Sequence, residues 1–204
     1  MAEVRHEAKR EVSMMQPGAF LKILILTLWI ATAATVATAQ EPSAEFDPPL
    51  LITSAGMGPE VQLAAILAKR AGIDHTLSKQ ATAGELAGFK SLAVVIGASL
   101  KGLGAAGIDT AKEKERVESI LAEAGKRKIP VILLHLGGEQ RRGELTDGMI
   151  EAYLPSADLV VVLKSGNKDG LFTRLAQAAK VPLVEVEKTV DAADVLKDAF
   201  KPKT

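Results

Sequence analysis

Residues Ser91–Gly107 read SLAVVIGASLKGLGAAG, and this stretch decides the fold class. It begins with five consecutive apolar residues, from Leu92 to Ile96, with no polar residue among them. A strand of this composition is typical of a parallel sheet that helices cover on both faces. The chain then passes into a glycine-rich segment that contains Lys101. Because ligands bind beyond the carboxyl ends of the strands in open α/β sheets, the stretch also predicts where a site lies.

Outward from this stretch, short apolar runs alternate with amphipathic segments. Repeated β-α alternation predicts one doubly wound, mostly parallel sheet over residues 50–204, a Rossmann-like or flavodoxin-like three-layer α/β sandwich. Residues 97–107 are expected to be a loop. The strands are expected at 50–53, 75–77, 91–96, 130–134, 159–163 and 182–186, and the helices at 59–71, 83–89, 110–126, 146–154, from 171 onward, and 192–200.

The helix expected at 59–71 has an unusual composition. Its middle, residues 63–68, is apolar without interruption, whereas a helix that covers one sheet face shows a polar stripe. We therefore expect it to have two partners, and a second subunit is one candidate.

The N-terminal segment has the layout of a targeting sequence. Residues 23–36, ILILTLWIATAATV, follow Lys22 and lead into Ala37-Thr38-Ala39. This arrangement predicts a secretory signal peptide over residues 1–39 and a polar tether over 40–49. An uncleaved anchor is the alternative, although the run is shorter than the ~20 residues that span a bilayer. The expected location is the periplasm or the exterior of a bacterium, with no membrane attachment after cleavage.

Composition limits the classes of partner. Of 25 basic and 25 acidic residues, four basic and three acidic ones lie in residues 1–39, which leaves a net charge of −1 for residues 40–204. This balance argues against nucleic acid or an anionic membrane as a partner. After residue 39 the aromatic residues are one tyrosine and four phenylalanines, too few for stacking platforms. The chain has no cysteine, which excludes disulfides.

Four glycine-rich loops, at 54–58, 97–107, 135–143 and 164–170, are expected at one end of the sheet because right-handed crossovers place them there. Backbone amides at glycines and helix N-termini, together with basic side chains, suit a carboxylate or phosphate. The alternative is that the glycines only permit tight turns and the basic side chains are solvated. The candidate ligand-binding residues are Ser54, Gly56, Gly97, Ser99, Lys101, Gly137, Gly138, Arg141, Arg142, Gly166, Asn167 and Lys168.

Other chemistries find less support. Residues 102–107 match G-x-G-x-x-G, but they do not follow the first strand and no acid ends the next one, so we expect no dinucleotide and no other cofactor. Two histidines after residue 39 and no cysteine argue against a zinc site. A nucleophile with His135 as base lacks a G-x-S-x-G elbow. The weak catalytic candidates are His135, Glu139 and Asp169.

The segment from Leu50 to about Lys188 resembles an uncharacterised family of exported bacterial α/β proteins, a domain of unknown function. Four stretches carry the resemblance: LLITSAGMGPEVQ, VVIGASLKGLGAAGID, HLGGEQRRGELTD and SGNKDGLFTRLA. They coincide with the four loops. The resemblance implies a shared architecture and no assigned activity.

Three functional hypotheses remain open. The first is an exported module that binds a small polar or anionic metabolite at the carboxyl ends of the strands. The second is a periplasmic hydrolase or lyase that uses His135 at the same place, which we favour less than binding alone. The third is an interaction module that works through an oligomeric or partner interface on the first helix.

Overall fold

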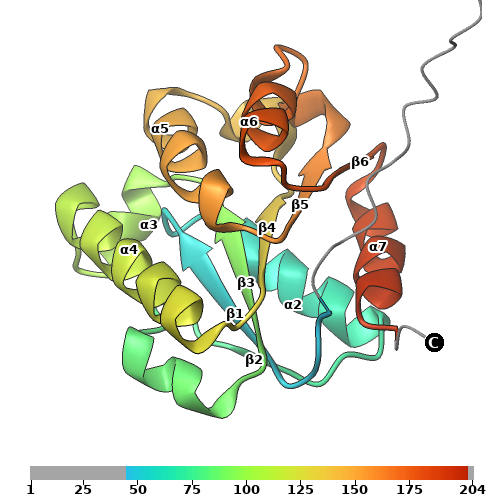
Figure 1. Cartoon of the computed structure of the whole chain (residues 1–204). Coiled ribbons are helices and arrows are strands. Elements are labelled where there is room, and N and C mark those ends of the chain that lie inside the picture. Colours follow the sequence, from blue (N-terminus) through green and yellow to red (C-terminus); the bar gives the residue numbers. More distant parts are fainter. Residues whose placement is uncertain (1–44, 202–204) are drawn as a thin grey trace, which may run out of the picture. The chain divides into compact units, whose positions relative to one another are not determined.

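The structure, a computed structural model, describes residues 45–201, and its centre is a six-stranded parallel sheet (Figure 1). The strand order is β2-β1-β3-β4-β5-β6. This order begins as the flavodoxin-like order 2-1-3-4-5 and adds one edge strand, which confirms the predicted fold class. The strands are β1 (Leu50–Ala55), β2 (His75–Leu77), β3 (Ser91–Ile96), β4 (Val131–His135), β5 (Leu159–Leu163) and β6 (Leu183–Val186).

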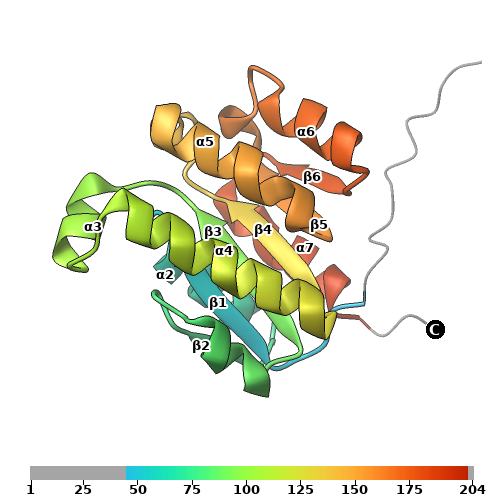
Figure 2. The same ribbon diagram turned by 60° about the vertical axis from the view of Figure 1, so that its left-hand side comes forward.

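Helices cover both faces of the sheet. Figures 1 and 2 show α2 (Glu60–Arg70) and α7 (Ala192–Ala199) on one face, with α4 (Thr110–Arg127), α5 (Glu144–Tyr153) and α6 (Leu171–Ala179) on the other. Every residue of β1 and β3 is buried, and successive residues of a strand enter opposite cores. This double burial is the reason for the unbroken apolar runs. The remaining elements are η1 (Ala83–Gly88), α3 (Leu100–Ala105), η2 (Gly138–Arg141), η3 (Leu154–Ser156), η4 (Lys164–Gly166) and η5 (Thr189–Asp191).

The apolar composition of α2 is explained within the chain itself. One side of the helix, with Val61, Ala64 and Leu67, is buried in the core between the sheet and the α2–α7 layer. The helix also packs against α7, which supplies the second partner that the sequence led us to expect. Ile66 is 62% exposed and is the large apolar residue of α2 that neither partner covers.

Two segments differ from their expected form. The loop expected at 97–107 contains α3, which begins where the Ser99 hydroxyl accepts a hydrogen bond from the Gly102 amide at 3.0 Å. The tether expected at 40–49 is packed at its described end, because Phe46 is 3% exposed and lies 5.9 Å from Phe200, ring centre to ring centre. The folded domain therefore begins a few residues before Leu50.

In the described part of the chain, none of the helices combines the length and apolar character needed to cross a bilayer. The signal peptide expected at residues 1–39 lies outside the described residues, as do residues 40–44 of the tether. Both stay predictions.

Candidate functional site

The candidate site lies beyond the carboxyl ends of β1 and β3. These strands are neighbours in the sheet. After β1 the chain passes to α2 on one face of the sheet, and after β3 it passes through α3 to α4 on the opposite face. Such a divergence is where ligands bind in this class of fold. A hollow of about 550 Å³ lies here, and its lining residues are Ser54, Met57, Gly58, Pro59, Val61, Lys79, Ser99, Lys101, Gly102, Ala105 and Arg141.

The Ser54 hydroxyl is the least satisfied polar group of the hollow. Ser54 is the fifth residue of β1 and is 1% exposed. Its Oγ is buried and has no hydrogen-bond partner among the described residues. A buried hydroxyl without a partner costs about 1–3 kcal/mol, so natural structures usually provide one.

Three basic side chains line the same hollow. Lys79 and Lys101 are exposed and make no ion pair with any described residue. The third, Arg141, donates from Nε to Glu60 Oε1 at 2.5 Å, and its side chain is 34% exposed. The hollow therefore has an excess of positive charge, with Glu60 as the one carboxylate paired to its lining.

Glu60 is held in place by the backbone of three glycines. A Cβ on Gly58 would lie 2.5 Å from Glu60 Oε2, and a Cβ on Gly97 or Gly137 would lie 3.2 Å from a carboxylate oxygen of Glu60. At Gly58 a side chain would also meet the carbonyl oxygen of Gly97 at 2.5 Å, so this position requires glycine, while Gly97 and Gly137 leave the carboxylate little room. Glu60 Oε2 is buried and has no hydrogen-bond partner among the residues described.

A buried ion pair on α4 holds the loop after β1. Glu113 is completely buried and accepts hydrogen bonds from Arg116 Nε at 2.9 Å and from the Gly56 amide at 2.7 Å. Arg116 also donates to Thr53 Oγ1 at 3.2 Å and to the carbonyl of Ser54. The pair fixes the end of β1 behind the site. Sequence analysis missed both residues, since an i, i+3 pair on a charged helix resembles any exposed pair.

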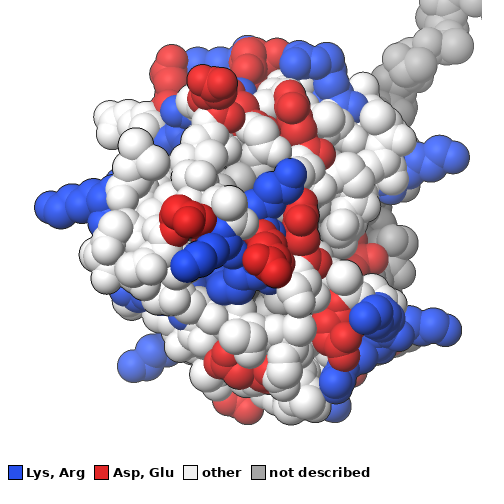
Figure 3. Space-filling view, turned by 90° about the vertical axis from the view of Figure 1, so that its left-hand side faces the viewer, with Lys and Arg blue, Asp and Glu red and all other residues white. Residues whose placement is uncertain are grey.

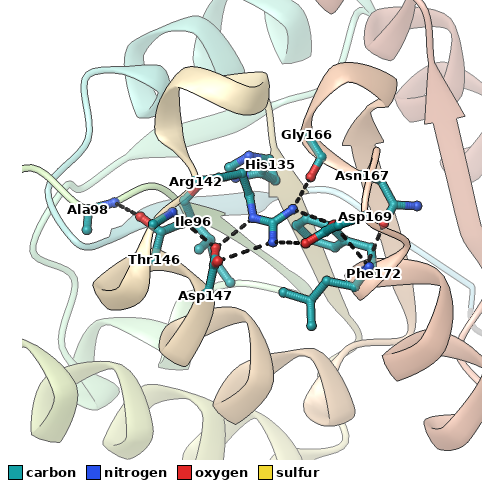
Figure 4. Close-up of polar contacts among 12 residues, drawn as sticks. Ile96, Ala98, His135, Arg142, Thr146, Asp147, Gly166, Asn167, Asp169 and Phe172 are labelled. Carbon is teal, nitrogen blue, oxygen red and sulfur yellow. Dashed lines mark hydrogen bonds and ion pairs between the residues drawn. The ribbon is translucent and has the colours of Figure 1, made fainter.

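The second half of the predicted site is a separate network around Arg142 (Figure 4). Arg142 Nε donates to Asp147 at 2.6 Å, and Nη2 donates to Asp169 at 2.8 Å. Its guanidinium also donates to the carbonyl of Gly166 and lies 5.8 Å from the ring centre of Phe172. The hydrogen bonds from Arg142 lower the pKa of both aspartates, and the two aspartates raise the pKa of Arg142. Its charge is thus compensated within the protein.

His135 is closed off from solvent at the end of β4. It is 0% exposed, and its two ring nitrogens each lie 3.1 Å from a backbone carbonyl, those of Ile96 and Gly138. Burial lowers the pKa of the imidazole, and the raising effect of the two carbonyls does not offset it. A neutral ring has one N–H and donates to one of these two carbonyls, while its other nitrogen faces the second carbonyl. In this arrangement no ring nitrogen is available to a substrate.

The other predicted residues also have partners. Asn167 is 7% exposed and accepts a hydrogen bond from the Phe172 amide at 2.9 Å, at the start of α6. Lys168 and Glu139 form an exposed ion pair at 2.6 Å. Figure 3 shows acidic and basic side chains mixed at the centre of the face that it presents, without a large patch of one sign. Arg141, Arg142, Lys164 and Lys168 of these loops each form an ion pair with a carboxylate.

The predicted site residues thus do not form one site. Ser54, Ser99, Lys101 and Arg141 line the hollow, whereas Gly97 and Gly137 pack on Glu60 behind it. The Gly56 amide is bound by Glu113. The rest belong to the Arg142 network and its surroundings: His135, Gly138, Glu139, Arg142, Gly166, Asn167, Lys168 and Asp169. Lys79 and Glu60 were not predicted, because nothing in their local sequence marks them. Among residues 45–201 no group of three or more acidic, histidine or cysteine side chains is placed to hold a metal ion.

The comparison with protein families gives one match, to the family described as "Domain of unknown function (DUF6305)", over residues 47–200. This chain belongs to that family. The match confirms the family resemblance, while the bacterial and exported character that the resemblance implies stays a prediction. No curated protein matches the chain significantly.

Among solved structures, the esterase AlinE4, described as a member of the SGNH-hydrolase family, is similar at 14% identity and a TM-score of 0.30, over 79% of this chain and 86% of that one. An archaeal fructose 1,6-bisphosphate aldolase is similar at 14% identity and a TM-score of 0.34, over 67% of this chain and 73% of that one. Similarity at this level carries no information about the activity of this DUF6305 chain.

Proposed function

We propose that this protein binds a small anionic metabolite in the hollow beyond β1 and β3. The observation that carries the proposal is the buried Ser54 hydroxyl, which has no hydrogen-bond partner within residues 45–201 and belongs to a residue that lines the hollow. Lys79, Lys101 and Arg141 at the same lining supply positive charge. A volume of about 550 Å³ is within the range of small-molecule sites.

The start of α2 supports the same ligand class. Gly58, Pro59 and Val61 line the hollow, so the first turn of an 11-residue helix borders it. The first backbone amides of a helix have no intrahelical acceptors, and they carry the positive end of the helix dipole. An anion in the hollow would therefore meet amides, a hydroxyl and basic side chains together.

Binding is favoured over catalysis by what the hollow contains. Its lining includes no histidine, aspartate or glutamate, and a general base must lie within hydrogen-bond reach of the proton that it takes. His135, the base considered from the sequence, is buried in the neighbouring network. The interaction hypothesis has less support, because α7 covers the second side of α2.

The test is a thermal unfolding series with inorganic phosphate, dicarboxylates, amino acids and nucleotides. An anion present at ~100 times its dissociation constant should add about 2.7 kcal/mol to the free energy of unfolding, which raises the melting temperature measurably. Lys101→Ala and Ser54→Ala should each reduce the shift, since one removes a charge and the other the unsatisfied hydroxyl.

The matched control is Lys168→Ala, which removes an equal charge from the exposed pair with Glu139. It should leave the ligand-induced shift unchanged. If the ligand still raises the melting temperature of Lys101→Ala and Ser54→Ala but not that of Lys168→Ala, the ligand binds at the other loops and not in the hollow. No shift with any anion would contradict the proposal.

A further inference from the structure

A second open space lies between α4 and α5, which run side by side on the sheet face opposite to α2 (Figure 2). Its volume is about 640 Å³, within the range of small-molecule sites. Its lining comes from these two helices and from Leu100 at the start of α3. This space, the α4–α5 groove, shares no lining residue with the hollow beyond β1 and β3, so a ligand of the groove occupies a separate site.

The α4–α5 groove is mainly apolar. Met149 and Tyr153 line it and are 5% and 2% exposed, because both belong to the core beneath α4, α5 and α6. Leu145 lines the groove and packs against the same core. Leu100, by contrast, is 73% exposed, more than any other large apolar residue within residues 45–201. A ligand that covers this apolar surface removes it from water, which is favourable.

Gly148 leaves space on the α5 side of the groove. It lies in the interior of α5 and belongs to the lining. A glycine inside a helix destabilises the helix relative to alanine. Neither the backbone nor the packing requires glycine here, because its φ is not positive and a Cβ would meet nothing within 4 Å. What the glycine does provide is open space, which a larger side chain would fill.

Tyr153 brings one polar group to the groove. Its hydroxyl makes no hydrogen bond with any residue in the described part of the chain, and burial raises its pKa to about 12. The phenol therefore stays protonated at neutral pH and can donate. The fully enclosed side-chain atoms without a partner within residues 45–201 are those of Ser54 and Glu60, and the Tyr153 hydroxyl is not one of them. It thus keeps access to open space, and Tyr153 lines the groove.

The lining also limits the kind of ligand. It contains one basic residue, Lys114, and one acidic residue, Glu144, so it has no net charge. A charged ligand would meet no excess of opposite charge, and contact with apolar side chains would cost it hydration. Ten residues line the groove, whereas a protein interface takes about 20–30 residues from each partner. The groove therefore fits a neutral small molecule better than a protein.

We propose that the α4–α5 groove binds a neutral, mainly apolar small molecule that has one hydrogen-bond-accepting oxygen. The oxygen accepts a hydrogen bond from the Tyr153 hydroxyl, and the apolar part of the molecule lies against Leu100, Leu145 and Met149. This site is additional to the anion site and does not depend on it.

The experiment is an NMR titration of the full chain, labelled with ¹³C at tyrosine, with methyl hexyl ketone. Tyr153 is the one tyrosine of the chain, so its ring signals report on the groove directly. We expect these signals to shift in a saturable way. Gly148→Leu should abolish the shift, because the added side chain fills the groove. Gly125→Leu should keep it, since Gly125 is an exposed glycine inside α4 where a Cβ also meets nothing within 4 Å, and it does not line the groove.

Tyr153→Phe tests the hydrogen bond. Its affinity for the ketone, followed by the amide signal of Met149, should fall about fivefold, the usual contribution of one neutral hydrogen bond. Its melting temperature should stay the same, because the hydroxyl has no partner to lose among the described residues. Octanoate, a carboxylate with the same number of carbon atoms, should bind more weakly than the ketone.

Three results of the titrations would overturn the inference: no saturable shift of the Tyr153 signals, an unchanged affinity in Gly148→Leu or Tyr153→Phe, or tighter binding of octanoate. A wild-type dimer that Gly148→Leu converts to monomers in sedimentation would overturn it as well, since a second copy of the chain would then occupy the groove. If Gly148→Leu does not fold, the Tyr153→Phe and octanoate comparisons decide. Failure of this inference leaves the proposed function standing, because the hollow is tested with anions and with other variants.

Discussion

Replacing Glu113 with alanine is expected to lower the free energy of unfolding by about 3–5 kcal/mol, which is the cost of breaking a buried ion pair from one side. Glu113 is completely buried, and its carboxylate holds Arg116 and the Gly56 amide. Without it, Arg116 is left as a nearly buried cation, 12% exposed, whose remaining acceptors are neutral. Chemical denaturation of the variant and the wild-type protein measures the difference.

Glu118→Ala on the same helix is the matched control. Glu118 forms an exposed pair with Lys114 at 3.7 Å, which should contribute less than about 1 kcal/mol. The double variant Glu113→Ala/Arg116→Ala should lose less stability than the two single variants added together, because no unpaired charge remains. Additive losses, or a cost for Glu113→Ala no greater than for Glu118→Ala, would contradict this account of the loop after β1.

Replacing Arg142 with glutamine is expected to lower the free energy of unfolding by about 2–3 kcal/mol at neutral pH, with little effect on ligand binding. The guanidinium joins Asp147, Asp169 and the carbonyl of Gly166, which come from α5 and the two ends of the 166–169 loop. We keep the expected cost moderate because Asp169 is 56% exposed and its ion pair is screened by water.

This loss should depend on pH in a defined direction. The pKa values of Asp147 and Asp169 are lowered in the folded protein, chiefly by the hydrogen bonds from Arg142. The stabilisation is therefore complete above the ordinary aspartate pKa of about 4 and is lost as the pH falls through the lowered values. The difference between wild type and Arg142→Gln should shrink as the pH decreases from about 5 toward 2. A difference that grows in acid would show that other groups stabilise this region.

The adjacent Arg141 offers a comparison at the next residue. Arg141→Gln should weaken anion binding with a smaller effect on stability, since this side chain lines the hollow and is 34% exposed. Arg142→Gln should therefore change mainly stability and Arg141→Gln mainly anion binding, which distinguishes the structural network from the proposed site.

The fold could be predicted from the sequence because the four central strands, β1, β3, β4 and β5, are buried on both faces. The runs at Leu92–Ile96 and Leu159–Leu163 have no polar alternation, and the structure places each between two helical layers. Asp109 marked the start of α4, where its carboxylate accepts from the Lys112 amide at 2.8 Å. The structure of residues 97–107 was harder to predict, because their four glycines favour a loop. In the structure the Ser99 hydroxyl caps the first turn of α3 within this segment.

The site could be predicted only in part. The ends of the strands indicated which loops to consider, and Ser54, Lys101 and Arg141 of those loops line one hollow. That a ligand binds to them stays a prediction. The sequence could not show that Arg142 pairs with aspartates five and 27 residues away, whereas Lys101 has no ion-pair partner among the described residues. Nor could it show that Glu60 contacts three glycines from three loops. Those distinctions depend on tertiary contacts that no local pattern encodes.

The most direct test of the central claim is an amide NMR titration of the ¹⁵N-labelled protein with inorganic phosphate and with a dicarboxylate. If the hollow beyond β1 and β3 is the binding site, the amide signals of Gly58, Val61, Ser99 and Gly102 should shift in proportion to saturation. The signals of residues 166–170, in the Arg142 network, should stay in place. Shifts confined to residues 166–170, or none at saturating concentrations of both compounds, would contradict the account.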